Sequence, residues 1–130
     1  MNSILKTLLS SLVYSFLLLT APAKAQVTPN TTLGNEASRL TPNQVINGAS
    51  ADRINGGAQR GINLFHSFGE FNIGNGQRVY FGNPVGVENI LTRVTGASTS
   101  NILGTLGVDG AANLFLINPN GIFFGQNALG

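Results

Sequence analysis

Short apolar clusters, each bounded by glycine, asparagine or proline, recur along the chain from residue 64 onward and limit its fold more than any other feature. The clusters are rich in β-branched and aromatic residues, and the later ones follow one another at roughly 8 to 12 residues, a spacing typical of strands joined by tight turns. No window shows the sustained apolar periodicity of an amphipathic helix. The clusters are 64–65, 68, 71–73, 79–81, 90–94, 102–106, 114–117 and 122–124. This pattern predicts an all-β protein.

Glycine and asparagine supply the expected turns. Gly74, Asn75 and Gly76 separate two apolar clusters, and we expect them to close a β-hairpin because both residue types tolerate positive φ. They do not form a dinucleotide-binding loop, which needs a third glycine at a fixed offset and a helix behind it. The chain has 17 glycines, and such enrichment fits repeated corners of a coiled β structure, which stacked asparagine ladders can stabilise.

A repeat supports a coiled arrangement. The apolar pattern that begins at Ile90 recurs at Leu114, about 24 residues later, which is close to one coil of a solenoid. Solenoids bury their apolar face against neighbouring coils, so they need about three repeats and end caps. This chain offers about two repeats, and its sequence stops after an apolar strand without a polar cap. We therefore expect an incomplete β-helix, from a fragment of a longer exported protein.

Residues 1–25 have the pattern of a signal peptide. Lys6 follows the start, residues 8–20 are strongly apolar, and Ala23 and Ala25 are small residues at the two positions that signal peptidase reads. We expect the Sec translocon and signal peptidase to act here, with cleavage before Gln26. The apolar run is interrupted by serines and is shorter than the roughly 20 residues of a membrane anchor. The chain lacks cysteine, so packing and backbone hydrogen bonds must stabilise the exported part.

The charge of the predicted mature chain excludes several functions. Both lysines, Lys6 and Lys24, lie in the leader, and residues 26–130 carry five arginines against five acidic residues. A neutral chain without clustered arginines lacks the electrostatic footprint of a nucleic-acid binder or a polybasic membrane surface. The absence of lysine from residues 26–130 also excludes a Walker-type phosphate site and Schiff-base chemistry within them.

The sequence gives no support for a catalytic site. His66 is the only histidine, which excludes a multi-histidine metal site. Ser67 follows it, but neighbouring residues of a strand point to opposite faces, so we expect His66 to pack locally with Phe65 and Phe68. The carboxylates of Asp52, Glu70, Glu88 and Asp109 are dispersed, and we expect them to be solvated or paired with arginines. We predict neither an enzyme nor a bound cofactor or metal.

One triplet fits a modification signal. Asn30, Thr31 and Thr32 match the sequon for N-glycosylation. The sequon is short and common in threonine-rich stretches such as residues 26–42, where we expect an extended lead-in with an edge strand. Chance therefore explains this match better than glycosylation.

The most specific segment of the chain is residues 113–125, NLFLINPNGIFFG. Pro119 fixes φ at a turn, Asn120 tolerates the next corner, and Gly121 frees the exit. Apolar strands are expected on both sides. Taken alone, the segment predicts a structural turn between two strands.

In its context this segment resembles a motif of a known family, the amino-terminal secretion (haemagglutination-activity) domain of filamentous-haemagglutinin and haemolysin-type exoproteins of two-partner secretion systems. The family's NPNGI-type motif corresponds here to Asn118, Pro119, Asn120, Gly121 and Ile122. Further matching stretches are residues 53–57, 63–68, 71 together with 79 and 81, and 86–96. The resemblance covers essentially all of residues 26–130.

The resemblance implies a right-handed parallel β-helix of the pectin-lyase-like kind, with an amino-terminal β cap. It further implies recognition by an outer-membrane β-barrel transporter with periplasmic polypeptide-transport-associated domains, folding outside the cell, and an adhesin-like protein that is released or held at the cell surface. The sequence departs from the family twice. An upstream NPNL-type motif is degenerate at Asn83 and Pro84, followed by Val85 and Gly86, and the carboxyl-terminal part of the secretion domain is missing.

Two other classes of function stay open at this point. Parallel β-helices include polysaccharide lyases and hydrolases, so a fragment of an exported carbohydrate-active enzyme is the enzymatic alternative. A passive surface protein could instead bind a host, a matrix or a neighbouring chain through exposed phenylalanines or asparagine ladders. The receptor, the transporter's identity and the oligomeric state have no signal in the sequence.

Overall fold

The computed structural model describes residues 26–130, which form strands, turns and one 3-10 turn. The leader and the predicted cleavage residues Ala23 and Ala25 lie outside the described residues, so their roles stay predictions. The expectation of an all-β chain is confirmed. In residues 26–130 no helix is long and apolar enough to span a membrane. The elements are β1 (Gln26–Pro29), η1 (Gly34–Glu36), β2 (Ser38–Ile46), β3 (Ala49–Gly56), β4 (Ala58–Arg60), β5 (Asn63–Asn72), β6 (Arg78–Gly82), β7 (Asn89–Val94), β8 (Ser100–Ile102), β9 (Thr105–Asp109), β10 (Asn113–Ile117) and β11 (Ile122–Phe124).

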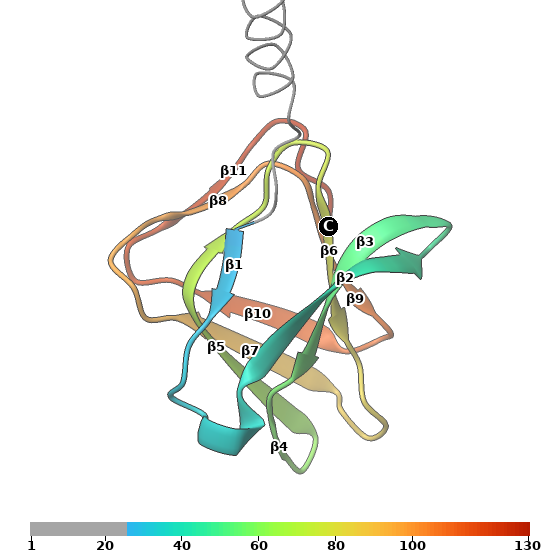
Figure 1. Ribbon diagram of the computed structural model, residues 1–130, viewed down its shortest axis with the longest axis vertical. Helices are drawn as coiled ribbons and strands as arrows, with labels where there is room; N and C mark the ends of the chain where they lie inside the picture. The colour runs from blue at the N-terminus through green and yellow to red at the C-terminus, as the bar shows by residue number, and fades with distance from the viewer. Residues whose placement is uncertain (1–25) are drawn as a thin grey trace, which may run out of the picture.

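Most of these strands pair in parallel with strands one repeat away in the sequence. β5, β7 and β10 stack side by side, β3, β6 and β9 form a second parallel stack, and β8 pairs with β11 in a third. Figure 1 shows the three stacks as sides of a roughly triangular outline. The predicted repeat is confirmed, because Leu114 is the register partner of Ile90.

Antiparallel pairing is confined to the amino-terminal part of the described chain. β1 and β4 each pair with β5, and β2 pairs with β3. The edge strand that we expected within residues 26–42 is therefore present as β1. These strands cover the free edges of the first parallel strands, which would otherwise expose unpaired backbone groups.

The predicted hairpin at Gly74, Asn75 and Gly76 is wrong. These residues do form a turn, closed by the Gln77 N–H donating to the Gly74 carbonyl at 3.0 Å, and Gly76 has a φ of 79°. However, β5 before the turn belongs to one sheet and β6 after it to another. The glycines thus make a corner between two sides of the coil. Turn residues indicate where the chain changes direction. They do not indicate which strands pair, because each strand pairs with a strand of the neighbouring coil.

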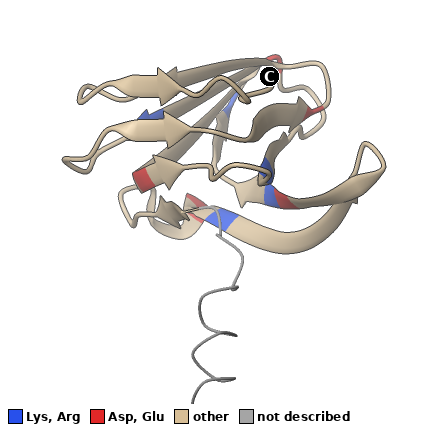
Figure 2. Ribbon diagram, turned by 90° about the horizontal axis from the view of Figure 1, so that it is seen from above, with Lys and Arg blue, Asp and Glu red and all other residues tan. Residues whose placement is uncertain are grey.

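A hairpin occurs instead where the sequence is polar. β2 and β3 are joined by Asn47 and Gly48, and Figures 1 and 2 show this hairpin projecting from the body of the molecule. Arg78 holds its end: its guanidinium donates to the Ile46 carbonyl at 3.0 Å and to the Ser50 carbonyl at 3.2 Å. The same guanidinium lies 5.2 Å from the centre of the Tyr80 ring, a cation–π distance.

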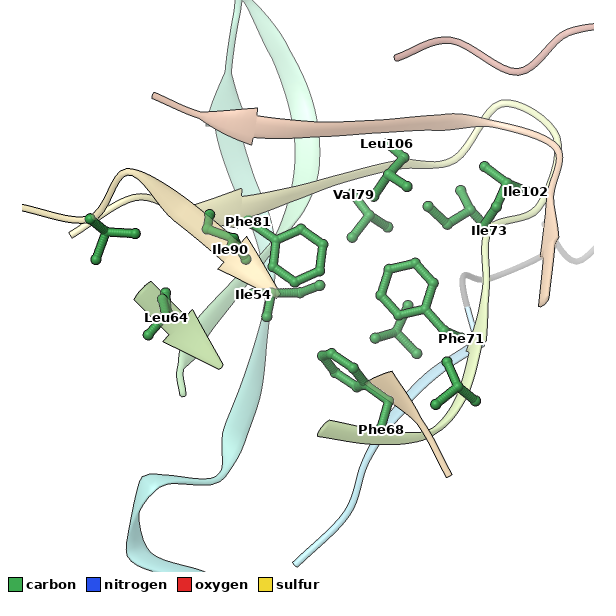
Figure 3. Close-up of a cluster of buried hydrophobic side chains, with 13 residues drawn as sticks. Ile54, Leu64, Phe68, Phe71, Ile73, Val79, Phe81, Ile90, Ile102 and Leu106 are labelled. Atoms are coloured by element: carbon green, nitrogen blue, oxygen red, sulfur yellow. The ribbon is translucent and has the colours of Figure 1, made fainter. Parts of the chain in front are cut away.

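The core lies between the three stacks. Figure 3 shows buried aliphatic and aromatic side chains from different strands pointing toward one another. At the centre, the Phe71 and Phe81 rings are stacked with centroids 6.0 Å apart, and the Phe68 ring meets Phe71 edge-on at 5.3 Å. All three rings are fully buried. Inward-facing residues of consecutive coils are thus joined into one apolar column, as the repeat predicts.

Candidate functional site

The NPNG corner, which we define as Asn118, Pro119, Asn120 and Gly121, joins β10 to β11. The Gly121 N–H donates to the Asn118 carbonyl at 3.0 Å. Proline at the second position of such a four-residue turn is favoured because its φ is already fixed. Gly121 has a φ of 110°, a value open to glycine and strained for other residues. The turn predicted from the motif is therefore present, and Ile122 begins the following strand.

Asn118 ties this corner to the preceding coil. Its side chain is buried, and its Nδ2 donates to the Ser98 carbonyl at 3.0 Å and to Ser100 Oγ at 2.9 Å. Its Oδ1 accepts from the Asn120 backbone N–H at 2.9 Å. The Asn118 amide therefore forms hydrogen bonds with two successive corners, with Ser98 and Ser100 in one and with Asn120 in the other. Among neutral side chains, only the amides of asparagine and glutamine offer two donors and an acceptor in this arrangement.

Asn120 adds a second connection between the same two corners. Its Nδ2 donates to the Gly96 carbonyl at 2.7 Å, and its carbonyl accepts from Thr99 Oγ1 at 3.3 Å. The Ser100 N–H donates to the Gly121 carbonyl at 3.1 Å. The corner at residues 118–121 is thus fastened to residues 96–100 by side chains and backbone together. This arrangement can hold coils together, and residues 96–100 and 118–121 contain no acidic or basic side chain that could activate a serine or threonine hydroxyl.

Asn83 and Pro84, the degenerate upstream motif, lie at a different corner, after β6. Asn83 Nδ2 donates to the Val87 carbonyl at 3.0 Å, and Asn83 Oδ1 accepts from the Ala112 N–H at 2.8 Å in the next coil. Gly110 packs so closely on this amide that a Cβ there would lie 2.4 Å from Asn83 Oδ1. The structure therefore does not bring Asn83 and Asn118 together, but each connects two successive coils.

Three more asparagines form a ladder of hydrogen-bonded side chains, which the sequence motifs did not identify. Asn63, Asn89 and Asn113 open β5, β7 and β10 and are register partners. Asn89 Nδ2 donates to Asn63 Oδ1 at 3.2 Å, and Asn113 Nδ2 donates to Asn89 Oδ1 at 3.2 Å, across 26 and 24 residues of sequence. Such a ladder is one of the ways in which a coiled β structure can be stabilised. Its sequence signal is an asparagine at the start of each apolar cluster, one repeat apart.

Asn30 of the sequon is occupied by a polar network. Its Nδ2 donates to Ser67 Oγ at 3.0 Å and to Thr95 Oγ1 at 2.9 Å, and its Oδ1 accepts from Thr32 Oγ1 at 2.7 Å. Arg93 Nε also donates to Ser67 Oγ, at 3.1 Å. This network fastens the segment after β1 to β5 and β7. Glycosylation of Asn30 in the folded chain would disrupt these contacts.

His66 pairs with a serine, but the partner is Ser38 of β2. The distance between Ser38 Oγ and His66 Nδ1 is 2.7 Å, and both side chains are buried. The expected packing against Phe68 is confirmed by ring centroids 6.1 Å apart, while the closer ring is Phe81 at 5.2 Å. Phe65 instead lies 37% exposed. No carboxylate contacts this histidine among the described residues, so the constellation lacks the third member of a catalytic triad.

Burial of His66 makes the stability of the fold sensitive to acid. Desolvation lowers the pKa of the imidazole to about 4, from 6.5 in a solvated chain. Between these values the unfolded chain binds a proton that the folded chain excludes, so stability is fully present above pH 6.5 and declines as the pH falls. We expect the free energy of unfolding to drop by about 3 kcal/mol across this window.

Denaturant unfolding at a series of pH values checks this expectation. The His66→Gln variant is the matched control, because it keeps a hydrogen-bonding side chain and removes the titration. Its profile should be flatter between pH 6.5 and 4. Equal slopes for the two proteins would show that other groups cause the acid sensitivity.

The acidic residues are dispersed, as expected. Glu36 pairs with Arg60 at 2.7 Å, and Asp109 pairs with Arg53. Figure 2 shows basic and acidic residues scattered over the ribbon. The Arg60 hydrogen bond holds the pKa of Glu36 below its usual range. Within residues 26–130, no three histidine or acidic side chains are grouped so that they could hold a metal ion.

The stacked parallel strands and the asparagine-fastened corners define a class of repeat-like β domain, and comparison with known families specifies it. The family model of the TPS secretion domain matches residues 25–129. The chain therefore belongs to the two-partner secretion domain family. No curated protein and no solved structure matches the chain significantly.

Family membership settles the broad function. The domain targets an exoprotein for secretion, the partner is a cognate outer-membrane transporter, and the destination lies beyond the outer membrane. A secretion-targeting domain has no catalytic task. The alternative of a carbohydrate-active enzyme fragment gains no support from the family match.

Proposed function

We propose that residues 26–130 are recognised by the transporter and then fold outside the cell into a right-handed parallel β-helix with an amino-terminal β cap. Three parallel stacks and antiparallel strands limited to the amino-terminal part support this arrangement. The observation that carries the proposal is Asn118, which connects two successive corners within the family's motif.

The proposed route begins with the Sec translocon, and signal peptidase cleaves after Ala25. In the periplasm the unfolded chain meets the polypeptide-transport-associated domains of the transporter. An extended segment without net charge can add its backbone to an exposed strand edge, as peptides do in β-augmentation. Asn118, Pro119, Asn120, Gly121 and Ile122 form the secretion motif in this proposal, and Asn83 and Pro84 form its degenerate counterpart.

Folding outside the membrane would oppose return of the chain. Each completed coil offers a free strand edge and a free asparagine amide on which the next coil can form. The ladder of Asn63, Asn89 and Asn113 extends this way across three strands. The NPNG corner acts at one such step, because Asn118 fastens it to Ser98 and Ser100 in the corner before it.

Asn118→Ala should therefore reduce secretion. The substitution removes the donors to Ser98 and Ser100 and leaves the buried Ser100 hydroxyl without this partner. Leaving a buried polar group unpaired costs about 1–3 kcal/mol, so we expect a several-fold fall in the amount of protein in the medium. The measurement is immunoblotting of medium, periplasm and cells in the presence of the transporter.

Asn127→Ala is the matched control. Asn127 is exposed, and its side chain makes no hydrogen bond within the described residues. Its alanine variant should be secreted like the parent chain. Secretion of Asn118→Ala at parental levels would show that the motif has no role in export.

The family resemblance supports a proposal for the whole exoprotein. We propose an adhesin or haemagglutinin-like protein, either released or held at the cell surface, with the binding activity in other regions of the exoprotein. Within residues 26–130, the aromatic side chains of Phe115, Phe123 and Phe124 are exposed. They are the residues through which a surface contact by this domain would be made.

A further inference from the structure

Four asparagines of the described chain are followed directly by glycine: Asn47, Asn55, Asn75 and Asn120. We propose that the fold divides them into two open and two closed sites of spontaneous deamidation, with Asn47 and Asn75 open and Asn55 and Asn120 closed. Asparagine–glycine pairs are chemically labile because glycine places no side chain in the way of the reaction.

The reaction needs only the chain and water. The deprotonated backbone nitrogen of the glycine attacks the side-chain Cγ of the asparagine, the new C–N bond closes a five-membered succinimide, and the side-chain nitrogen leaves as ammonia. Water then opens one of the two ring carbonyls, which yields aspartate or isoaspartate. Ring closure requires a free glycine N–H and a side chain that can rotate onto it.

Asn47 and Asn75 meet both requirements. Asn47 and Gly48 form the exposed tip of the β2–β3 hairpin, where the last register pair is Ile46 with Ala49. Asn75 and Gly76 are exposed at the corner after β5. No hydrogen bond within the described residues holds the side chain of either asparagine or the N–H of the glycine that follows it.

Asn120 fails both requirements. Its Nδ2 donates to the Gly96 carbonyl at 2.7 Å and to Asn118 Oδ1 at 3.1 Å. The attacking nitrogen, that of Gly121, donates its proton to the Asn118 carbonyl at 3.0 Å. Reaction at Asn120 therefore requires the NPNG corner to open first.

Asn55 is closed by a different arrangement. It lies within β3, and its Nδ2 donates to Thr41 Oγ1 at 3.0 Å. Gly56 is the register partner of Ser38 in β2. A Cβ at Gly56 would lie 2.4 Å from the Ala37 carbonyl oxygen, so the chain has little room to rotate here.

Closure at Asn120 protects the corner itself. Deamidation would replace the amide donor by a carboxylate facing the Gly96 carbonyl oxygen, so the connection to the preceding coil would be lost. An unfolded chain has no such protection. Folding thus preserves the chemical integrity of the motif, while the hairpin tip accumulates negative charge with age.

The test incubates the purified full chain at mildly alkaline pH, folded in one sample and unfolded in guanidinium chloride in the other. Trypsin cleaves after Arg39, Arg53, Arg60, Arg78 and Arg93, so each of the four asparagines falls on a different peptide. Mass spectrometry then follows conversion at each site over time. In the folded sample, Asn47 and Asn75 should react at least about tenfold faster than Asn55 and Asn120, which corresponds to about 1.4 kcal/mol for local opening.

In the unfolded sample the four rates should converge. The double variant Asn47→Gln with Asn75→Gln is the control, and it should lose nearly all deamidation at these four sites in the folded state. Four equal rates in the folded protein would overturn the inference. It would also be overturned by an unchanged order of rates in guanidinium, because local sequence would then explain the difference. The assay needs no transporter, so its result is independent of the proposed secretion role.

Discussion

Phe81→Ala is expected to lower the free energy of unfolding by about 3–5 kcal/mol, the range for removing a large buried aromatic ring. Phe81 is fully buried in β6 and stacks on Phe71 at 6.0 Å. It also meets Phe68 at 6.5 Å and His66 at 5.2 Å, so its loss leaves a cavity among rings from two sides of the coil. Small domains have only about 5–15 kcal/mol of stability in total, so much of the fold's stability would be lost.

Urea unfolding of the purified chain at neutral pH measures this effect. Phe115→Ala is the matched control, because the Phe115 side chain is 49% exposed on the outer face of β10. It should cost about 1 kcal/mol or less. Similar losses for the two variants would contradict the packing described for the core.

Gly104→Ala is expected to destabilise the fold by about 3 kcal/mol, at the upper end of the usual cost of overpacking. A Cβ at residue 104 would lie 2.3 Å from the Gln77 carbonyl oxygen and 2.5 Å from that of Gly74. Both obstacles are backbone atoms of the preceding corner, which cannot rotate away as a flexible side chain does. The coils would have to separate at this corner to admit one methyl group.

Gly69→Ala makes the same chemical change where space exists. Its new Cβ would meet only the Thr28 carbonyl oxygen, at 3.8 Å. We expect a change within about 1 kcal/mol of the parent chain, since alanine also reduces the entropy of the unfolded state. Thermal and urea unfolding of both variants compare the two positions. A tolerated alanine at residue 104 would show that the corners are not in close contact.

The positions of the later strands could be predicted from the sequence, because their apolar clusters face a common core. The clusters at 90–94 and 114–117 correspond to β7 and β10 and pair in the predicted register. The cluster at 102–106 is divided between β8 and β9, because Gly104 turns the chain from one sheet into another. Apolar content marks a strand, but it carries no information on which side of the coil the strand occupies.

The amino-terminal hairpin could not be found from apolar clusters. β2 and β3 are largely polar, and only their inner residues, such as Ile46 and Ile54, are buried. The signal that was present is Asn47 followed by Gly48, a pair strongly preferred in two-residue hairpin turns. The turn at residues 74–76 has the same chemistry and makes a corner. An asparagine–glycine pair therefore predicts a turn, but it does not predict whether the two flanking strands pair with each other.

The motif at residues 118–122 was found from the sequence, whereas its contacts were not. Turn chemistry explains Pro119 and Gly121, but the partners of Asn118 are Ser98 and Ser100 in the preceding coil. Those partners follow only from the register of β8 with β11. The repeat is irregular, with separations of 26 and 24 residues along the asparagine ladder, so spacing alone does not predict which side chains meet.

Secretion of the chain with and without its transporter tests the central claim most directly. Residues 1–130 would be fused to an inert reporter and produced in a double-membrane bacterium that contains or lacks the cognate outer-membrane transporter. We predict that the reporter reaches the medium only when the transporter is present. Retention in the periplasm with the transporter present, or equal release without it, would contradict the proposal that the transporter recognises residues 26–130.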